Sequence, residues 1–397
     1  MKPLAIAFSK RTAWDTTETA LAKALRELQQ SGRPVLDLTA SNPTRCGFDY
    51  DADSLLAPLA NPSALDYDPN PRGMLHAREA ICRYYAEHRA SLDPEQIFLT
   101  TSTSEAYSFV FRMLCDSGDE VLIAQPSYPL FDFIAELDDV RLVPYPLIYD
   151  HGWQMDEQSI RQRITSRTRA IVLVNPNNPT GHFTKPWERE MLEGLSREHG
   201  LSLIIDEVFL DYSFDSSAAA PSFAQGEAGA LTFVLSGLSK VAGLPQMKAA
   251  WIACLGPQAE RRQAQDRLEV IADTFLSMNA PVQWALPHWL ATRDGIQNQI
   301  RARVRENLAA LDEILAGQTL ASRLALEGGW CAVLRIPSIH HDEKTAMALL
   351  AEGVSVHPGY FFGFLESGWL VISLLGLAND FRRGVLATLH HIEQESN

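Results

Sequence analysis

Residues 170–206, AIVLVNPNNPTGHFTKPWEREMLEGLSREHGLSLIID, carry the clearest signal of the fold class. This stretch begins with the apolar run Ala170–Val174 and ends with a second run, Leu201–Asp206, and the segment between them, Trp187–His199, resembles a helix. Buried apolar runs that alternate with helices are typical of a mostly parallel sheet covered on both faces. This stretch therefore predicts an α/β domain.

The same alternation extends along most of the chain. Further apolar runs and one more helical segment lie at Gln96–Thr100, Glu105–Leu114, Glu120–Ala124, Leu231–Ser236 and Ala249–Cys254. Beyond about Pro281 the pattern changes to a long amphipathic stretch, Asp294–Leu315, followed by strands with helices at Trp330–Ile336 and Trp369–Leu374. We expect a large α/β/α domain over residues 46–280 and a smaller α+β domain over residues 281–397. Residues 1–45, with a helix capped by Asp15 or Thr16 and ending at Gly32, join the smaller domain.

Composition limits the possible partners and compartments. The net charge is −15, from 34 basic and 49 acidic residues, which argues against nucleic acid because phosphate binding needs a dense basic face. The five cysteines form no CxxC pair, so neither a disulfide framework nor a zinc site is indicated. No apolar run approaches the roughly 18 residues of a membrane span. We expect a cytoplasmic protein without a metal site. The two histidine pairs in the C-terminal part do not change this expectation, because no carboxylate or cysteine stands near them at the spacing of a metal site.

Residues suited to chemistry follow four of the predicted strands. They are Thr100-Thr-Ser-Thr-Ser-Glu-Ala106, Asn175-Pro-Asn-Asn-Pro-Thr-Gly181, Asp206-Glu207 and Ser236-Gly-Leu-Ser-Lys240. The first motif opens a predicted helix, whose N–H groups can face a phosphate, although taken alone it is more often an ordinary helix cap. The second motif is also typical of an ordinary turn, the Asp206-Glu207 pair of a helix cap, and Lys240 of a solvated loop lysine. Yet a lysine near a buried sheet end loses its proton easily, as a Schiff base requires.

The order of these motifs resembles the fold-type I pyridoxal 5′-phosphate (PLP) enzymes, specifically the class I and II aminotransferases. Asn178 and Asp206 lie 28 residues apart (206 − 178), and Asp206 and Lys240 lie 34 apart (240 − 206). Other matching elements are Tyr67-Asp-Pro with Gly73, Ala77-Arg-Glu-Ala-Ile81, Pro126-Ser-Tyr-Pro129 and Pro358-Gly359. The resemblance therefore covers most of the chain.

The resemblance implies a role for each matching residue. Lys240 would hold PLP as a Schiff base and then move a proton between the substrate and the cofactor. Asp206 would pair with the pyridine nitrogen, which keeps the ring electron-accepting. Further cofactor contacts would come from Ser102, Thr103, Tyr128, Asn178, Ser236, Ser239 and Lys248. Tyr67 would reach the phosphate of a neighbouring subunit, which implies a homodimer with shared active sites.

The chain also departs from the family pattern. Phe209 stands where many relatives have a tyrosine, and nearby Tyr212 could supply the missing hydroxyl. Val371 stands where relatives carry the arginine that binds the substrate carboxylate, and valine cannot bind one. Arg45, and less so Arg335, are the candidate replacements, although a surface ion pair explains either equally well.

The resemblance favours an aminotransferase acting on an amino acid and a 2-oxo acid. The same scaffold also hosts lyases, decarboxylases and oxidases, and the missing arginine keeps those reactions open. A non-catalytic, ligand-responsive regulator is the third hypothesis. It is disfavoured because the first 40 residues are too few and too little basic for a DNA-binding module.

Overall fold

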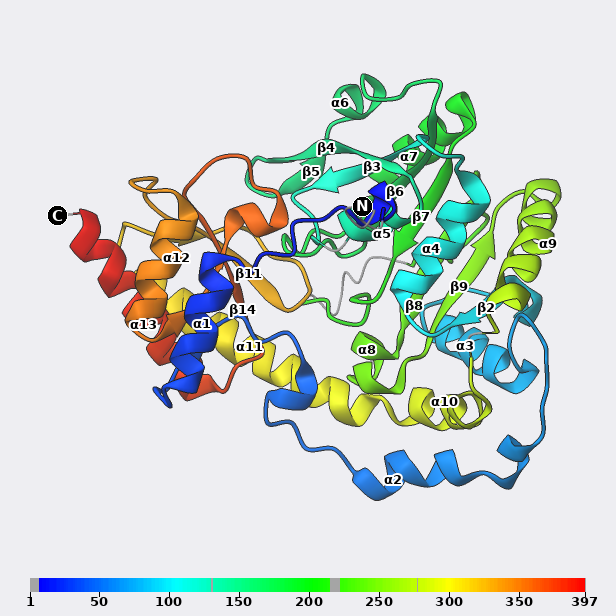
Figure 1. Ribbon diagram of the computed structural model, residues 1–397, viewed down its shortest axis with the longest axis horizontal. Helices are drawn as coiled ribbons and strands as arrows, with labels where there is room; N and C mark the ends of the chain where they lie inside the picture. Colours follow the sequence, from blue (N-terminus) through cyan, green and yellow to red (C-terminus); the bar gives the residue numbers. More distant parts are fainter. Residues whose placement is uncertain (1–6, 130, 215–221, 277, 397) are drawn as a thin grey trace, which may run out of the picture.

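The computed structural model describes residues 7–129, 131–214, 222–276 and 278–396. Its larger part is built on an eight-stranded sheet with the strand order β2-β9-β8-β7-β6-β3-β4-β5 (Figure 1). The strands are β2 (Ile97–Thr100), β3 (Glu120–Gln125), β4 (Arg141–Tyr149), β5 (Trp153–Met155), β6 (Thr168–Val174), β7 (Ser202–Asp206), β8 (Thr232–Gly237) and β9 (Ala250–Leu255). The expected α/β architecture is confirmed.

The central strands β8, β7, β6, β3 and β4 are parallel, whereas β9 and β5 run antiparallel to their neighbours. Because β2 pairs antiparallel with β9, and β9 with β8, strand β2 points the same way as the parallel strands. The carboxyl ends of β2, β3, β6, β7 and β8 therefore meet at one edge of the sheet. Each of the chemistry-bearing motifs follows one of these ends.

Helices cover both faces of this sheet. On one face α3 (Leu75–Glu87), α7 (Pro186–His199) and α10 (Ala280–Thr292) share a core with Leu203 and Ile205 of β7. On the other face α4 (Thr103–Leu114), α5 (Phe131–Leu137) and α9 (Gln258–Phe275) pack with Ile204 of the same strand. Alternate side chains of β7 thus enter two separate cores, which explains why its sequence is apolar throughout.

The smaller part contains a four-stranded antiparallel sheet with the order β10-β11-β14-β13. Its elements are β10 (Ser322–Arg323), β11 (Cys331–Arg335), β13 (His357–Pro358), β14 (Trp369–Ser373), α11 (Asp294–Ala316), α12 (Asp342–Ala351) and α13 (Ala378–Ser396). The N-terminal segment joins it, because β1 (Leu36–Asp37) pairs in parallel with β12 (Val354–Ser355).

Two local predictions need correction. Helix α1 spans Ala20–Gln30, and Thr19 caps it through the backbone N–H of Ala22, so the cap is neither Asp15 nor Thr16. Strands β4 and β5 were not predicted, because β4 is largely exposed and contains Pro144 and Pro146. Prolines and an exposed face remove the apolar signal of an inner strand. Within the described residues, no helix combines the length and the apolar character needed to cross a membrane.

Candidate active site

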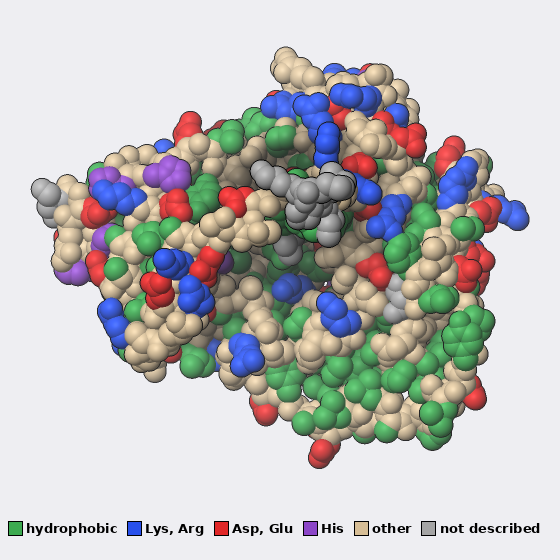
Figure 2. Space-filling model, viewed as in Figure 1, with side chains coloured by type: hydrophobic (Ala, Val, Ile, Leu, Met, Phe, Trp, Pro, Cys, Tyr) green, Lys and Arg blue, Asp and Glu red, His purple; other side chains and the backbone are tan. Residues whose placement is uncertain are grey.

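A cavity of about 420 Å³ lies where the carboxyl ends of the large sheet meet the smaller part of the molecule. Thr39 and Ser41 of the N-terminal segment also line it. The predicted residues that line it are Thr103, Tyr128, Asn178, Asp206, Ser239 and Lys240. In Figure 2 this region appears as a hollow near the middle of the molecule, with basic side chains in and around it. The structure thus brings together residues that are up to 137 positions apart (240 − 103).

Lys240 enters this cavity from the short helix α8 (Leu238–Val241), directly after β8. Its Nζ lies 4.8 Å from the centre of the Trp330 ring and 5.7 Å from that of Phe209. The same Nζ lies 3.5 Å from the Ser41 carbonyl oxygen, which accepts a hydrogen bond from it. Burial lowers the pKa of the Lys240 amine, since a low-dielectric site disfavours the charged form. The amine therefore becomes a nucleophile and a base more readily than an exposed lysine does.

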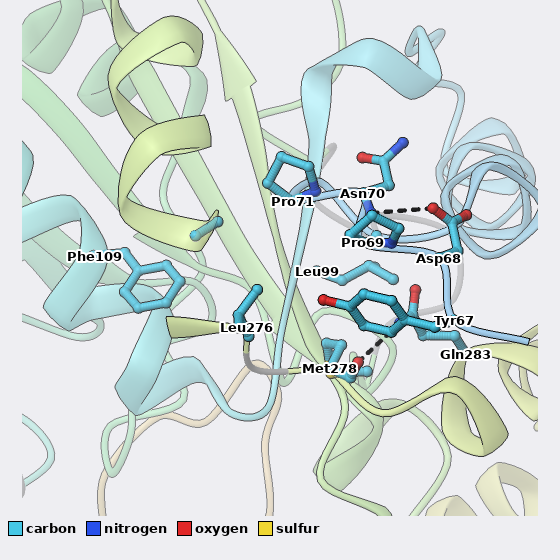
Figure 3. Close-up of a pocket in the computed structure, with 12 residues that line it drawn as sticks. Tyr67, Asp68, Pro69, Asn70, Pro71, Leu99, Phe109, Leu276, Met278 and Gln283 are labelled. Atoms are coloured by element: carbon cyan, nitrogen blue, oxygen red, sulfur yellow. Dashed lines mark hydrogen bonds between the residues drawn. The ribbon is translucent and has the colours of Figure 1, made fainter. Parts of the chain in front are cut away.

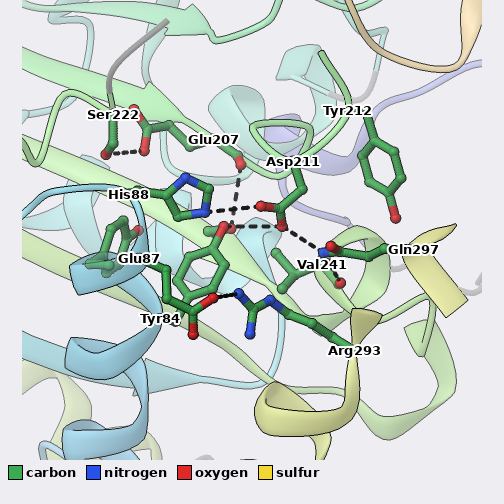
Figure 4. A network of polar contacts seen from close by, with 12 residues as sticks. Tyr84, Glu87, His88, Glu207, Asp211, Tyr212, Ser222, Val241, Arg293 and Gln297 are labelled. Carbon is green, nitrogen blue, oxygen red and sulfur yellow. Dashed lines mark hydrogen bonds and ion pairs between the residues drawn. The ribbon is translucent and has the colours of Figure 1, made fainter. Parts of the chain in front are cut away.

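The backbone around Lys240 is held by side chains from elsewhere in the chain. The Tyr212 hydroxyl donates to the Lys240 carbonyl at 2.7 Å, and the Gln297 amide donates to the Val241 carbonyl at 2.6 Å. Gln297 also donates to Asp211 at 2.8 Å, and Asp211 pairs with His88 at 2.9 Å (Figure 4). These contacts fix the position of α8. They also engage the Tyr212 hydroxyl, so the suggestion that it replaces a tyrosine at position 209 is not supported.

Asp206 ends β7 and is only 7% exposed. Its carboxylate accepts hydrogen bonds from the Val208 backbone N–H at 3.0 Å and from the Tyr107 hydroxyl at 3.2 Å. Burial raises the pKa of Asp206 to about 6, and these two hydrogen bonds together with the Lys240 charge offset only part of that rise. A buried carboxylate of this kind is suited to a ligand that brings a protonated nitrogen.

The adjacent Glu207 is wholly buried and points away from the cavity, into the network shown in Figure 4. It accepts hydrogen bonds from the Ser222 hydroxyl at 2.6 Å and the Phe223 N–H at 2.7 Å. Burial raises the pKa of Glu207 to about 7. The Asp-Glu pair therefore has one member on each side of the backbone, as alternation along an extended segment requires.

The amino-terminal end of α4 faces the same cavity. Ser102 caps the helix by accepting from the Glu105 N–H at 3.1 Å, while Thr103 and Ser104 line the cavity. Helix ends of this kind present free N–H groups and a partial positive charge to anions. Ser102 thus acts as an ordinary cap through its hydroxyl, and Ser104, which was not predicted, takes a place in the lining.

Several predicted cofactor residues lie outside the cavity lining. Ser236 is fully buried, and its hydroxyl contacts the Glu207 carbonyl at 3.5 Å. Lys248 is exposed and ends a short 3-10 turn with φ of 51°. Tyr67 is 80% exposed and lies at a second, smaller pocket formed with Leu99, Leu276 and Met278 (Figure 3).

Neither arginine proposed for the substrate carboxylate reaches the cavity. Arg45 is exposed in the turn Pro43–Arg45, which Asn42 caps. Arg335 is four residues beyond the cavity-lining Cys331 on β11, which corresponds to about 13 Å along a strand. Its guanidinium is exposed and lies 5.6 Å from the Trp369 ring centre. The structure does not support either assignment.

Sequence reasoning also missed part of the lining. Trp330, Cys331 and His357 come from the smaller part of the molecule and complete the cavity. The available signals were a tryptophan after two glycines and a histidine in front of Pro358 at the end of an apolar run. Tyr107, which donates to Asp206, lies one turn after Thr103 on α4.

The donor set fits PLP, the cofactor that the resemblance implies. The α4 end suits the phosphate, Asp206 suits the ring nitrogen, Asn178 suits the phenolic oxygen, and the Lys240 amine suits the aldehyde. Tyr128 offers an aromatic face to the ring. Each of these five residues or element ends lines the one cavity, which is why the site fits this cofactor.

Comparison with known proteins points to the same family as the order of the motifs. The sequence profile of the family "Aminotransferase class I and II" matches residues 59–383. The glutamate-pyruvate aminotransferase AlaA of Escherichia coli is 33% identical over 267 residues, 66% of this chain and 65% of the relative, so the match spans just under two thirds of that protein. The aspartate/prephenate aminotransferase of Thermus thermophilus is 27% identical over 354 residues, 86% of this chain and 87% of the relative.

Solved structures resemble this fold along its whole length. An aminotransferase from Escherichia coli superposes with a TM-score of 0.85 at 25% identity and covers 98% of both chains. An alanine aminotransferase from Pyrococcus furiosus gives a TM-score of 0.87 at 22% identity, with 98% of this chain and 100% of that chain covered.

Proposed function

The chain belongs to the class I and II aminotransferases, and from that membership we propose that it transfers an amino group between an amino acid and a 2-oxo acid. The observation that carries the proposal is the shared cavity of Lys240 and Asp206. A nucleophilic amine and a buried carboxylate face one space, which also receives a helix end suited to phosphate. The family's cofactor is PLP, and the donor set of the cavity fits it.

When bound, the cofactor supplies an aldehyde carbon that holds the amino group and a conjugated ring that accepts the electron pair left at the substrate α-carbon. Lys240 would hold the aldehyde carbon through its amine. The same amine, whose pKa burial lowers, would carry the proton between the substrate α-carbon and C4′ of the cofactor. Asp206 would keep a proton on the ring nitrogen, and the α4 end would bind the phosphate.

The test is the first half of the transfer, run without any 2-oxo acid. PLP-loaded protein is mixed with L-alanine, which the names of several relatives suggest, and with a panel of other amino acids. Release of the matching 2-oxo acid, in an amount no larger than the enzyme present, supports the proposal. Catalytic release of ammonia or carbon dioxide would instead assign a lyase or a decarboxylase. Lys240→Ala should abolish release, and Lys344→Ala, at an exposed lysine of α12, should not.

We also propose a homodimer in which Tyr67 reaches the partner's phosphate site. Support comes from apolar side chains between residues 56 and 75 that are exposed, with Leu65 90%, Tyr67 80%, Leu56 55% and Leu75 51% exposed. Figure 2 shows hydrophobic side chains gathered where Figure 1 has α2 (Ala52–Leu56), α3 and α10. Apolar patches of this kind usually mark an interface. Light scattering should give twice the mass of the chain, and Leu65→Asp should lower it; a monomeric wild type would reject the dimer.

The remaining expectations are proposals about organisation and compartment. We infer three parts, residues 1–45, 46–280 and 281–397, and a cytoplasmic location. The location is supported by five free cysteines, a state typical of a reducing compartment. Limited proteolysis would test the boundaries, and fractionation of the source cells would test the location.

A further inference from the structure

The position of the missing arginine has a neighbour that can take its place. Val371 is fully buried in β14, and in the antiparallel pairing of β13 with β14 the residue opposite it is His357. Directly opposed residues of an antiparallel pair have Cβ atoms about 4.5–5.5 Å apart on the same face. His357 therefore stands beside the point from which relatives project their carboxylate-binding arginine.

His357 also lines the cavity that holds Lys240. Among the described residues that line this cavity, Lys240 and His357 are the two side chains able to carry a positive charge. Lys240 is committed to the cofactor, so His357 is the cation left for a substrate. Its ring lies between aromatic neighbours, with ring centres 5.9 Å from Phe361 and 5.7 Å from Phe362.

The N-terminal segment connects the two cations. The Ser41 carbonyl contacts the Lys240 Nζ at 3.5 Å, and the backbone of Thr39 lies close enough to the His357 ring to raise its pKa. Residues 39 and 41 are two positions apart, which limits the distance between their backbones to roughly 7 Å. This separation suits one small substrate, with its amino group near Lys240 and its carboxylate near His357.

We propose that His357 binds the α-carboxylate of the amino-acid substrate, in the place of the arginine that Val371 lacks. The inference rests on the proposed function and narrows its substrate class. The rest of this end of the cavity is Trp330, Phe361, Phe362 and Leu375. No second cation among the described lining residues is left for a side-chain carboxylate. The favoured donor is therefore a monocarboxylic amino acid with an apolar side chain.

The protonation of His357 makes this recognition depend on pH. Burial lowers the pKa of His357, while the charge of Asp37 and the Thr39 hydrogen bond raise it to a smaller extent. Other ionisable groups nearby are Lys240, Asp206 and Cys331 in the cavity and Tyr360 on the following turn, while Asp342 of α12 is engaged with the Gly368 and Trp369 N–H groups. With no carboxylate present, the imidazole is therefore neutral near pH 8.

Carboxylate binding reverses this preference. A neutral imidazole has a single N–H group, so a ring whose N–H faces the Thr39 backbone can donate to a carboxylate from its other nitrogen only after it takes up a proton. Binding at a pH above the pKa of the free imidazole should therefore be accompanied by proton uptake. As the pH rises through the imidazole pKa of the complex, affinity should fall, by up to tenfold for each pH unit.

The test uses 3-phenylpropanoate, a carboxylate with an apolar side chain and no amine to react. Its affinity for the PLP-loaded enzyme is measured by calorimetry and compared with that of the neutral 3-phenylpropanamide. His357→Gln should weaken the carboxylate at least about tenfold, in line with hydrogen bonds between charged partners, and leave the amide nearly unchanged. His390→Gln, at an exposed histidine of α13, is the matched control and should change neither.

Two further measurements separate recognition from a structural role. Titrations in buffers of different ionisation enthalpy should give a proton uptake that is lost in His357→Gln. His357→Arg should keep carboxylate binding and remove its dependence on pH. Equal carboxylate affinity in the wild type and His357→Gln overturns the proposal, as does an uptake that survives the substitution. If the protein binds no PLP, the proposed function fails, while the same comparison on the cofactor-free protein still decides the role of His357.

Discussion

Replacing Asp206 by asparagine should make the cofactor-free protein more stable at neutral pH while impairing the loaded enzyme. The carboxylate is buried, and among the described residues its hydrogen-bond donors are Tyr107 and Val208. An asparagine has nearly the same shape and carries no charge. The substitution therefore removes the cost of burying a charge that these donors and Lys240 offset only in part.

The size of this effect follows from the pKa of Asp206. Burial raises it from 3.8 to about 6, and at 1.36 kcal/mol for each pKa unit the difference corresponds to about 3 kcal/mol. Because the folded-state pKa lies above the unfolded value, the folded protein loses about 3 kcal/mol of stability as the pH rises from 3.8 through 6. About 2 kcal/mol of this loss occurs between pH 4.5 and pH 7.5. The advantage of Asp206→Asn over the wild type should grow by that amount across this range.

Urea unfolding of both cofactor-free proteins at the two pH values measures this growth directly. Asp49→Asn, at an exposed carboxylate, is the control and should show no comparable change. With PLP bound the order should reverse. The rate of α-proton removal should fall roughly tenfold to a thousandfold, because the ring nitrogen loses the charge that keeps it protonated. An advantage that does not change between the two pH values would refute the reasoning.

Four further substitutions probe the site and the elements around it. Arg45→Ala and Arg335→Ala should each leave the KM for an amino donor within about twofold of the wild type, because both side chains are exposed outside the cavity; a tenfold rise would restore the arginine assignment. Phe209→Tyr places a hydroxyl beside Lys240, and the pH midpoint of the visible absorbance change of the loaded enzyme should fall by about one pH unit; an unchanged midpoint in a spectrophotometric titration would contradict this. Gly359→Ala places a Cβ 2.5 Å from the Trp369 Cβ, so unfolding should become easier by about 1–3 kcal/mol, and an unchanged melting temperature would exclude the clash.

The large sheet was predictable because its strands carry their own signal. Six of its eight strands were predicted within two residues of their observed ends, since nearly all residues of these six strands are buried. The motif order placed Lys240, Asp206, Asn178, Tyr128 and Thr103 at one edge, and all five line the cavity. Strand topology alone implies this convergence, because the carboxyl ends of parallel strands meet at one edge.

The substrate end of the cavity was not predictable in the same way. His357 and Trp330 reach the cavity through the packing of the smaller part against the larger one, and no local pattern encodes that contact. Arg335 was chosen because its strand was expected to pair with the strand of Val371, and the two strands, β11 and β14, do pair. Register and exposure then put it beside Trp369 at the wrong end of β11, a detail that depends on the exact pairing.

The central claim is that the amine of Lys240 holds the cofactor, and chemical trapping tests it most directly. The PLP-loaded protein is reduced with borohydride, digested, and mapped by mass spectrometry. The account predicts one modified peptide, with the added pyridoxyl phosphate mass on Lys240. A modification confined to another lysine, such as Lys248, or no modified peptide at all, would contradict it.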